Sequence, residues 1–99
     1  MKLRFAWNRA KAERNLRLHG ISFEAAAQVF DDPNHVVSEN YYVDQDGEQR
    51  YQIIGMTRGL LLLLVVFVDR GDADGEVIRI VSARKAVDYE KSIYHDQFR

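Results

Sequence analysis

Cysteine is absent from this chain of 99 residues, and proline occurs only once. Without cysteine the chain has no disulfide, no thiolate nucleophile and no Cys-based metal site, which is typical of a reducing compartment. The longest apolar run, residues 60–68, has nine residues, whereas a membrane-spanning helix needs roughly 20. The N-terminal segment carries positive charge without an apolar stretch behind it. We therefore expect a cytoplasmic protein that is neither secreted nor membrane-bound.

Motifs for metal and nucleotide binding are also scarce. The three histidines lack the spacing of a zinc site, and the chain has no glycine-rich phosphate loop. Asp72, Asp74 and Gly75 fit the third, fifth and sixth positions of a calcium-binding EF-hand loop. However, Arg70 and Val81 then occupy its first and last positions, where carboxylates are needed. We expect no metal ion and no cofactor.

Size and composition indicate one globular domain over residues 1–99, because 11.5 kDa with 46% hydrophobic residues can supply one core. The net charge is −1, yet the charges are segregated along the chain. Residues 1–20 carry six basic residues against Glu13 alone, whereas residues 21–49 carry seven acidic residues and neither Lys nor Arg. Such a chain can fold with one basic and one acidic face, or its charges can simply interleave on the surface.

Hydropathy periods and turn residues predict an α+β fold in the order β-α-α-β-β-β-β-α, with the helices on a mostly antiparallel sheet. The unbroken apolar run 60–68 predicts a central strand that is covered on both faces. Turns are expected at 44–47 and 58–59, and a polar loop at 69–75. The predicted strands are 2–7, 35–43, 48–57, 60–68 and 76–81, and the predicted helices are 9–19, 23–30 and a last one that begins after Ser82.

Capping residues mark the expected helix boundaries. Asn8 and Ser22 can each accept hydrogen bonds from the free amides at the start of a helix. Gly20 can adopt the left-handed conformation that ends a helix, and Asp-Asp-Pro at 31–33 is expected to stop the second one. By the same reasoning Ser82 is predicted to cap the last helix.

Two arginines are the most informative candidates for a binding site. Arg79 lies between apolar residues in a predicted strand, where a guanidinium costs free energy unless it is paired or faces an anion. Arg84 falls in the first turn of the predicted last helix, where the helix dipole disfavours a cation. Arginine binds phosphate oxygens in a bidentate manner, so these positions predict a phosphate site. Its candidate residues are Lys11, Arg50, Arg79, Arg84 and Lys85.

A purely structural explanation of the same residues stays open at this point. Arg79 and Arg84 can instead form ion pairs within the protein. His19 can be a helix-end residue that bonds a carbonyl, or it can be a catalytic base. The acidic partners available to the arginines are Glu48, Glu76 and Glu90.

Motifs along nearly the whole chain share the order and spacing of one known family. They are Phe5-x-Trp7-x-x-x-Lys11-x-x-x-Asn15-x-x-x-His19-Gly20-Ile21-x-Phe23-x-x-Ala26, Val29-Phe30-Asp31-Asp32, Gly47-Glu48-x-Arg50, Ile54-Gly55 and Ile78-Arg79-Ile80-Val81-Ser82-Ala83-Arg84-Lys85-Ala86, with Glu90 and Tyr94 after them. In this pattern the chain resembles the BrnT family of toxins. Two positions depart from it, because Asn8 stands where Asp is usual and Leu18 where Lys is usual.

The resemblance implies a RelE-like ribonuclease, the toxin of a bacterial type II toxin–antitoxin pair that inhibits translation and growth. Its partner would be a BrnA-like antitoxin that blocks the toxin and joins it in a heterotetramer. This complex would repress the promoter that both share, so DNA would be contacted only through the antitoxin. RNA would be the substrate.

The expected reaction is RNA cleavage without a metal, in which the 2′-hydroxyl of the substrate attacks the adjacent phosphate. Arg79 and Arg84 would stabilise the negative charge that grows on the phosphate oxygens. The candidates for holding the RNA backbone are Lys11, Arg50 and Lys85, and those for moving protons are Glu48 and His19.

The alternative function is a binding module with the toxin fold that has lost catalysis and acts as a corepressor with a DNA-binding antitoxin. The departures at Asn8 and Leu18 favour this alternative. A basic face that binds nucleic acid without cutting it is a further possibility, and its affinity would fall steeply with salt.

Overall fold

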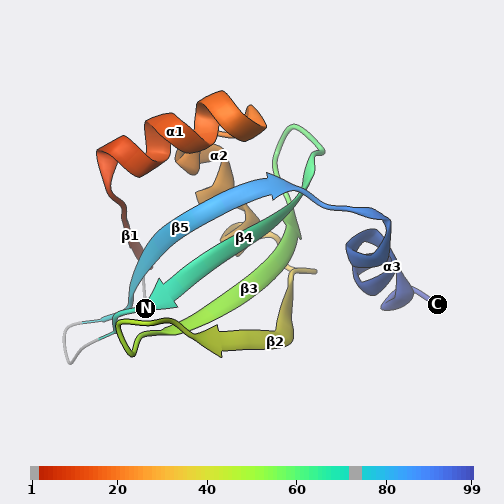
Figure 1. Ribbon diagram of the computed structural model, residues 1–99. Helices are drawn as coiled ribbons and strands as arrows, with labels where there is room; N and C mark the ends of the chain where they lie inside the picture. Colours follow the sequence, from red (N-terminus) through yellow and green to blue (C-terminus); the bar gives the residue numbers. More distant parts are fainter. Residues whose placement is uncertain (1–2, 72–74) are drawn as a thin grey trace.

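The computed structural model describes residues 3–71 and 75–99 of the chain. These residues form a five-stranded sheet in the order β1-β5-β4-β3-β2, with helices on both faces (Figure 1). β1 pairs parallel with β5, and all other neighbours are antiparallel. The predicted α+β class and element order are confirmed. The elements are β1 (Arg4–Ala6), α1 (Arg9–His19), α2 (Phe23–Gln28), the 3-10 helix η1 (Val29–Asp31), β2 (Val36–Val43), β3 (Gln49–Met56), β4 (Leu62–Asp69), β5 (Val77–Lys85) and α3 (Asp88–Asp96).

α1 begins and ends where the sequence predicts, and α2 begins where predicted. The sequence predicts that the second helix reaches residue 30, but α2 ends at Gln28 and the 3-10 helix η1 follows it to Asp31. The side chain of Asn8 accepts a hydrogen bond from the backbone N–H of Lys11 at 3.0 Å, and Ser22 accepts one from Ala25 at 3.0 Å. Gly20 has a φ of 70°, in the left-handed region that glycine adopts without strain. Both predicted caps and the predicted helix end are therefore confirmed.

The prediction for the last helix is wrong at its start. β5 continues to Lys85, and Ser82 lies inside this strand, opposite Val66 of β4. The unbroken ladder with β4 outweighs the local capping preference of a serine, because tertiary pairing routinely overrides such preferences. α3 begins only at Asp88. Arg84 is thus a strand residue, and the helix-dipole argument does not apply to it.

The turn before β4 also differs from the prediction. The strand begins at Leu62, because residues 57–61 form a turn in which Thr57 accepts the backbone N–H of Leu60 at 3.0 Å. The left-handed residue of this turn is Leu60, with a φ of 64°, and not the neighbouring Gly59. The loop predicted at 69–75 includes Asp72 and Asp74, which lie outside the described residues.

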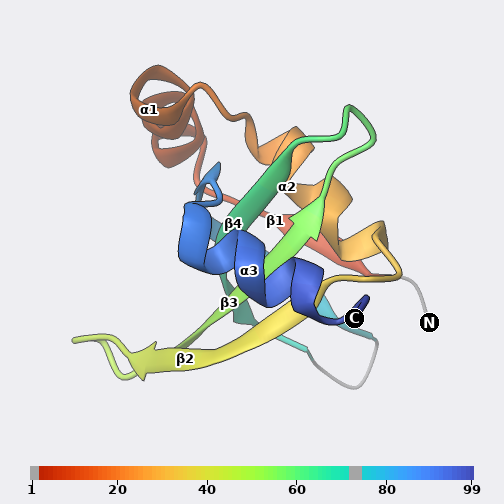
Figure 2. The same ribbon diagram turned by 90° about the vertical axis from the view of Figure 1, so that its right-hand side faces the viewer.

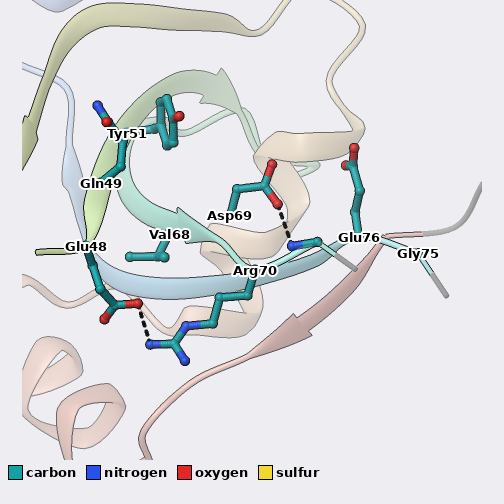
Figure 3. Close-up of a pocket in the computed structure, with 9 residues that line it drawn as sticks. Glu48, Gln49, Tyr51, Val68, Asp69, Arg70, Gly75 and Glu76 are labelled. Carbon is teal, nitrogen blue, oxygen red and sulfur yellow. Dashed lines mark hydrogen bonds and ion pairs between the residues drawn. The ribbon is translucent and has the colours of Figure 1, made fainter. Parts of the chain in front are cut away.

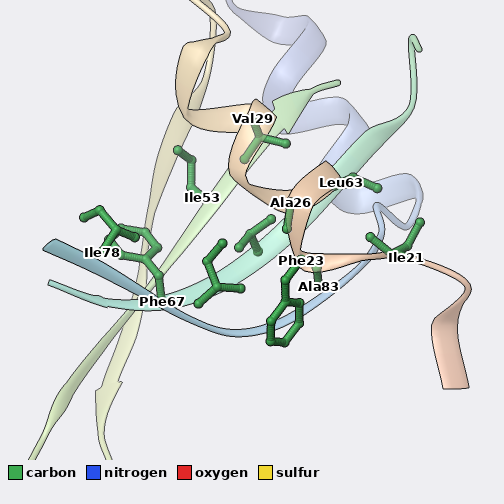
Figure 4. Close-up of a cluster of buried hydrophobic side chains, with 11 residues drawn as sticks. Ile21, Phe23, Ala26, Val29, Ile53, Leu63, Phe67, Ile78 and Ala83 are labelled. Atoms are coloured by element: carbon green, nitrogen blue, oxygen red, sulfur yellow. The ribbon is translucent and has the colours of Figure 1, made fainter. Parts of the chain in front are cut away.

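The main core lies between the sheet and the layer formed by α1, α2 and η1 (Figure 4). Gly55 of β3 is essential to this packing, because a Cβ at this position would lie 2.9 Å from the Cβ of Val29 in η1. The buried residues of the cluster are Ile21, Phe23, Ala26, Val29, Ile53, Leu63, Val65, Phe67, Ile78, Ile80 and Ala83.

The opposite face of the sheet is covered only in part. A second, smaller cluster joins Ile54 and Leu64 to Tyr94 of α3. Figure 2 shows α3 in front of the strands, and Figure 1 shows it beyond the C-terminal end of β5, away from β1. No helix formed by the described residues lies over the part of this face that extends from α3 toward β1.

A carboxylate network fastens α3 to the sheet. Asp32 accepts hydrogen bonds from the hydroxyl of Tyr94 at 2.7 Å, from the backbone N–H of Met56 at 2.8 Å and from that of Asn34 at 2.9 Å. Burial raises the pKa of Asp32, but these hydrogen bonds outweigh it and hold its pKa below the ordinary value. Burial and the bond to Asp32 raise the pKa of Tyr94 to about 12.

A buried asparagine joins α1 to the edge of β5. β1 pairs only with residues 77–79 of β5, so the edge beyond them has no strand partner. Asn15, which is 6% exposed, donates from Nδ2 to the carbonyl of Ala83 at 2.8 Å and accepts the N–H of Ala83 on Oδ1 at 3.1 Å. Its Nδ2 also donates to the carbonyl of Ile21 at 2.9 Å. The side-chain amide thus takes the place of a backbone partner.

Asn15→Ala is expected to lower the free energy of unfolding by about 2–4 kcal/mol, because it leaves buried backbone groups of Ala83 and Ile21 without partners. Urea denaturation measures this loss. Leu18→Ala, at a position on the same helix that is 65% exposed, is the control and should change stability by less than about 0.5 kcal/mol. Equal effects of the two substitutions would contradict the role of Asn15.

Tyr94→Phe is expected to destabilise the protein by about 1 kcal/mol near neutral pH, because it removes one hydrogen bond to Asp32. The pKa of Tyr94 is raised from 10.0 to about 12, so its contribution is complete below pH 10 and is lost as the pH rises through 12. The difference in unfolding free energy between wild type and variant should therefore shrink from pH 10 to 12. A difference that stays constant over this interval would show that the pKa is not raised.

Candidate active site

The register of the sheet decides which side chains share the face that α1 and α2 do not cover. Cross-strand partners point to the same side of a sheet. Leu64, which lies under α3, pairs with Arg84, and farther along β4 Val68 pairs with Arg79. Arg84 therefore lies beside α3, and Arg79 lies on the part of the face without a helix over it. We call this part the open face.

A groove of about 240 Å³ runs between α1 and β5. Lys11, Arg14 and His19 line it from α1, and Ser82 lines it from β5. Ser82 lies between Arg79 and Arg84 in the strand and shares their face. Four predicted site residues, Lys11, His19, Arg79 and Arg84, thus border the same segment of β5.

Arg79 is the cation of this group that is most available to a ligand. It is partly buried, and within residues 3–71 and 75–99 its guanidinium forms neither a hydrogen bond nor an ion pair. The internal pairing that the sequence left open is therefore not found for Arg79 in the described part of the chain. A partly buried guanidinium without a partner is stabilised strongly when an anion binds to it, because the anion compensates for the lost hydration.

Arg84 is committed to a partner. Its two terminal nitrogens donate to the two carboxylate oxygens of Glu90, each at 2.8 Å. Glu90, whose side chain is 12% exposed, also accepts the backbone N–H of Val87. Burial raises the pKa of Glu90, yet the bonds from Arg84 and Val87 hold its pKa below the ordinary value. The ion pair expected as the alternative for Arg84 is thus present.

Arg79 and Arg84 do not form a single binding site for one phosphate. Their partners on β4, Leu64 and Val68, are four residues apart, which corresponds to roughly 14 Å along a strand. Since Arg84 is also held by Glu90, the sheet offers two separate cationic positions. A bound polyanion can contact both, whereas a single small phosphate cannot.

Arg50 and Glu48 are also engaged in ion pairs. Arg50 donates to Asp44 in the β2–β3 turn at 2.8 Å, and the backbone N–H of Glu48 together with Arg50 holds the pKa of Asp44 below its usual value. Glu48 itself accepts from Arg70 at 2.7 Å. Figure 3 shows this pair in a cavity of about 590 Å³ that Asp69 and Glu76 also line. Glu48 and His19 therefore line different cavities.

Lys85 lies apart from these residues. It is exposed at the end of β5 and lines a different groove, between the turn at 57–61 and α3. The structure therefore does not bring this predicted RNA-binding residue to the segment of β5 around Ser82.

Sequence reasoning missed Asn15 and Ser82 as residues that shape the site. Asn15 holds the helix that carries Lys11 and His19 against β5. The sequence contains a hint of this role. Asparagine is a poor helix former, so an asparagine in the middle of the predicted helix 9–19 indicates that its side chain forms a hydrogen bond elsewhere. Ser82 was assigned to a helix cap instead of the strand.

Neither a metal-binding cluster nor a membrane-spanning helix is found among the described residues. Within residues 3–71 and 75–99, no three metal-ligating side chains lie close enough together to hold an ion. No helix in the same residues is long and apolar enough to cross a bilayer.

The fold and site define a small α+β protein with cations on an open sheet face, an arrangement suited to a polyanionic ligand. The chain belongs to the BrnT family, described as the ribonuclease toxin of type II toxin–antitoxin systems, whose model matches residues 7–90. The resemblance seen in the sequence is therefore confirmed.

The solved structure of the ribonuclease toxin BrnT from Brucella abortus has the same fold. It superposes with a TM-score of 0.62 at 23% sequence identity and covers 87% of this chain and 99% of that one. At this identity the likeness concerns the fold alone. A comparison with curated proteins finds no match.

Proposed function

We propose that the chain is an endoribonuclease toxin that binds RNA across the open face and the groove beside α1. Family membership supports the ribonuclease activity. The placement rests on one observation above all, the partly buried Arg79 without a partner among the described residues. Acting on RNA in the cytoplasm, such an enzyme would stop translation and growth in the manner of RelE-like toxins.

The proposed reaction needs no metal. The 2′-oxygen of a ribose attacks the adjacent phosphorus, the bond to the 5′-oxygen breaks, and a 2′,3′-cyclic phosphate and a 5′-hydroxyl remain. Arg79 stabilises the charge on the non-bridging oxygens during this step. One group must accept the proton of the 2′-hydroxyl and one must supply a proton to the 5′-oxygen.

His19 is the better supported of the two candidates for proton transfer. It lines the same groove as Lys11, next to the strand segment that carries Arg79. Glu48 is bound to Arg70 in another cavity, so its use would require this ion pair to open. Lys11 and Arg14, which line this groove, hold the RNA backbone in this proposal.

Arg84 and Arg50 take supporting roles in this proposal. Arg84 contacts a neighbouring phosphate at the border of α3. The β4 partners of Arg84 and Arg79 are four residues apart, so this phosphate lies farther along the RNA than the one at Arg79. Arg50 is held by Asp44 near the start of β3, so its use in RNA binding would require this ion pair to open. The partner is a BrnA-like antitoxin, which forms a heterotetramer with the toxin and alone contacts DNA.

One observation favours the alternative, a corepressor without catalysis. Leu18 lines the groove beside His19, where the family pattern has a lysine, so the groove has one cation fewer. A chain of this kind would still bind its antitoxin but would not cut RNA.

Expression of the chain in bacteria should stop growth and fragment total RNA. Co-expression of the antitoxin should restore growth and keep the RNA intact. RNA fragments with cyclic phosphate ends, formed equally well in EDTA, are the expected products of the purified chain. Accumulation of folded protein with intact RNA and normal growth would support the corepressor instead. Cleavage that EDTA abolishes would contradict the reaction without a metal.

Arg79→Ala should lower the rate of RNA cleavage roughly 100-fold or more, because it removes charge stabilisation in the transition state. Its stability should change little, since Arg79 has no partner within the described residues. Arg84→Ala should lose stability as well, because it leaves the carboxylate of Glu90 without its partner.

Cleavage assays and urea denaturation on the same proteins separate these two effects. Arg58→Ala, which removes an exposed arginine outside the site, is the matched control and should leave the cleavage rate unchanged. Full activity of Arg79→Ala would show that the site lies elsewhere.

A further inference from the structure

A second groove, of about 440 Å³, lies between the turn at 57–61 and α3. Leu60 and Leu61 of the turn line it and are 80% and 42% exposed. Lys85 and Lys91 add positive charge to its wall beside the imidazole of His95, and in the described part of the chain no acidic side chain lines it. The groove thus combines an exposed apolar surface with positive charge.

The backbone under these leucines is strained. Leu60 has a φ of 64°, which is unfavourable for a residue with a side chain, although Gly59 next to it could take this conformation freely. The hydrogen bond from its N–H to Thr57 and the one from Leu61 to the Thr57 hydroxyl hold the turn in place. Strained residues that the surrounding structure holds in place cluster at binding sites, and here the strained residue is a leucine that is 80% exposed.

We propose that this groove is the docking site for an acidic, amphipathic segment of the antitoxin. The inference rests on the proposed function, since it takes the partner to be the antitoxin of this toxin. Apolar side chains of the segment would cover Leu60 and Leu61, and its carboxylates would face Lys85 and Lys91. Charge complementarity of this type steers association and fixes register.

RNA is the less suitable occupant of this groove. Single-stranded RNA stacks its bases on aromatic rings, and among the described residues no Phe, Tyr or Trp lines this groove. Aliphatic side chains in a concave site instead fit a protein segment that buries apolar residues. Lys85 is accordingly assigned to the antitoxin and not to the RNA substrate.

Leu60→Gly separates docking from folding, because it removes the side chain and also relieves the strain. The variant should be at least as stable as wild type in urea. Its affinity for the purified product of the adjacent antitoxin gene should fall by about tenfold or more in calorimetry. Lys91→Glu should give a similar loss, with most of it in the association rate.

Matched controls come from the rest of the surface. Val43→Ala changes an exposed aliphatic residue at the other end of the sheet, and Arg17→Glu reverses an exposed charge on α1. Both should bind the antitoxin with the affinity of wild type. Unchanged affinity of Leu60→Gly and Lys91→Glu, or no binding by wild type, would overturn the proposal.

Two further measurements identify a different occupant. If Leu60→Gly weakens RNA binding instead of antitoxin binding, the groove is an RNA site. If it converts a self-associating chain into a monomer in sedimentation, the groove binds a second copy. RNA cleavage by free wild type is followed in parallel, so a failure of the ribonuclease proposal is distinguishable from a failure of the docking proposal.

Discussion

The side-chain amide of Asn15 is the contact on which the arrangement of the site depends. β1 is too short to pair with all of β5, and without another partner the backbone of Ala83 would be buried with unmet hydrogen bonds. Asn15, which lies on α1, forms hydrogen bonds with both the carbonyl and the N–H of Ala83. Because the same helix carries Lys11 and His19, satisfying a sheet edge also fixes two cationic or titratable groups beside the strand of Arg79.

α3 determines which part of the second sheet face is covered and which part stays open. The bonds of Asp32 to Tyr94 and to the backbone of Met56 hold this helix over one end of the sheet, so the remainder of that face stays open. Glu90 on α3 then binds Arg84 in a bidentate pair. The two arginines differ for this reason, since one lies at the border of a helix with a carboxylate and the other lies beyond its reach.

The sequence predicted the element order, the first two helices and their caps, because these depend on local signals such as Asn8 and Ser22. It failed at Ser82, whose capping preference is weaker than the ladder between β4 and β5. The same error placed Arg84 in a helix. Residue types also indicated Arg79 and Arg84 as candidates, but pairing with Glu90 depends on where α3 packs, which no local pattern contains. The same holds for Lys85, because no local pattern shows that this residue, next to Arg84 in the sequence, lines a different groove.

The exposed turn at 57–61 and the open face share α3 as a common border. Glu90 of α3 contacts Arg84 on one side, whereas Lys91 and His95 face the groove of Leu60 on the other. α3 rests on a small cluster and on the Asp32 network rather than on the main core. An element with few buried contacts is easier to shift than a core strand. A ligand in this groove would therefore contact the helix that holds Arg84, so occupation of the groove and the position of this arginine are physically linked through a single short helix.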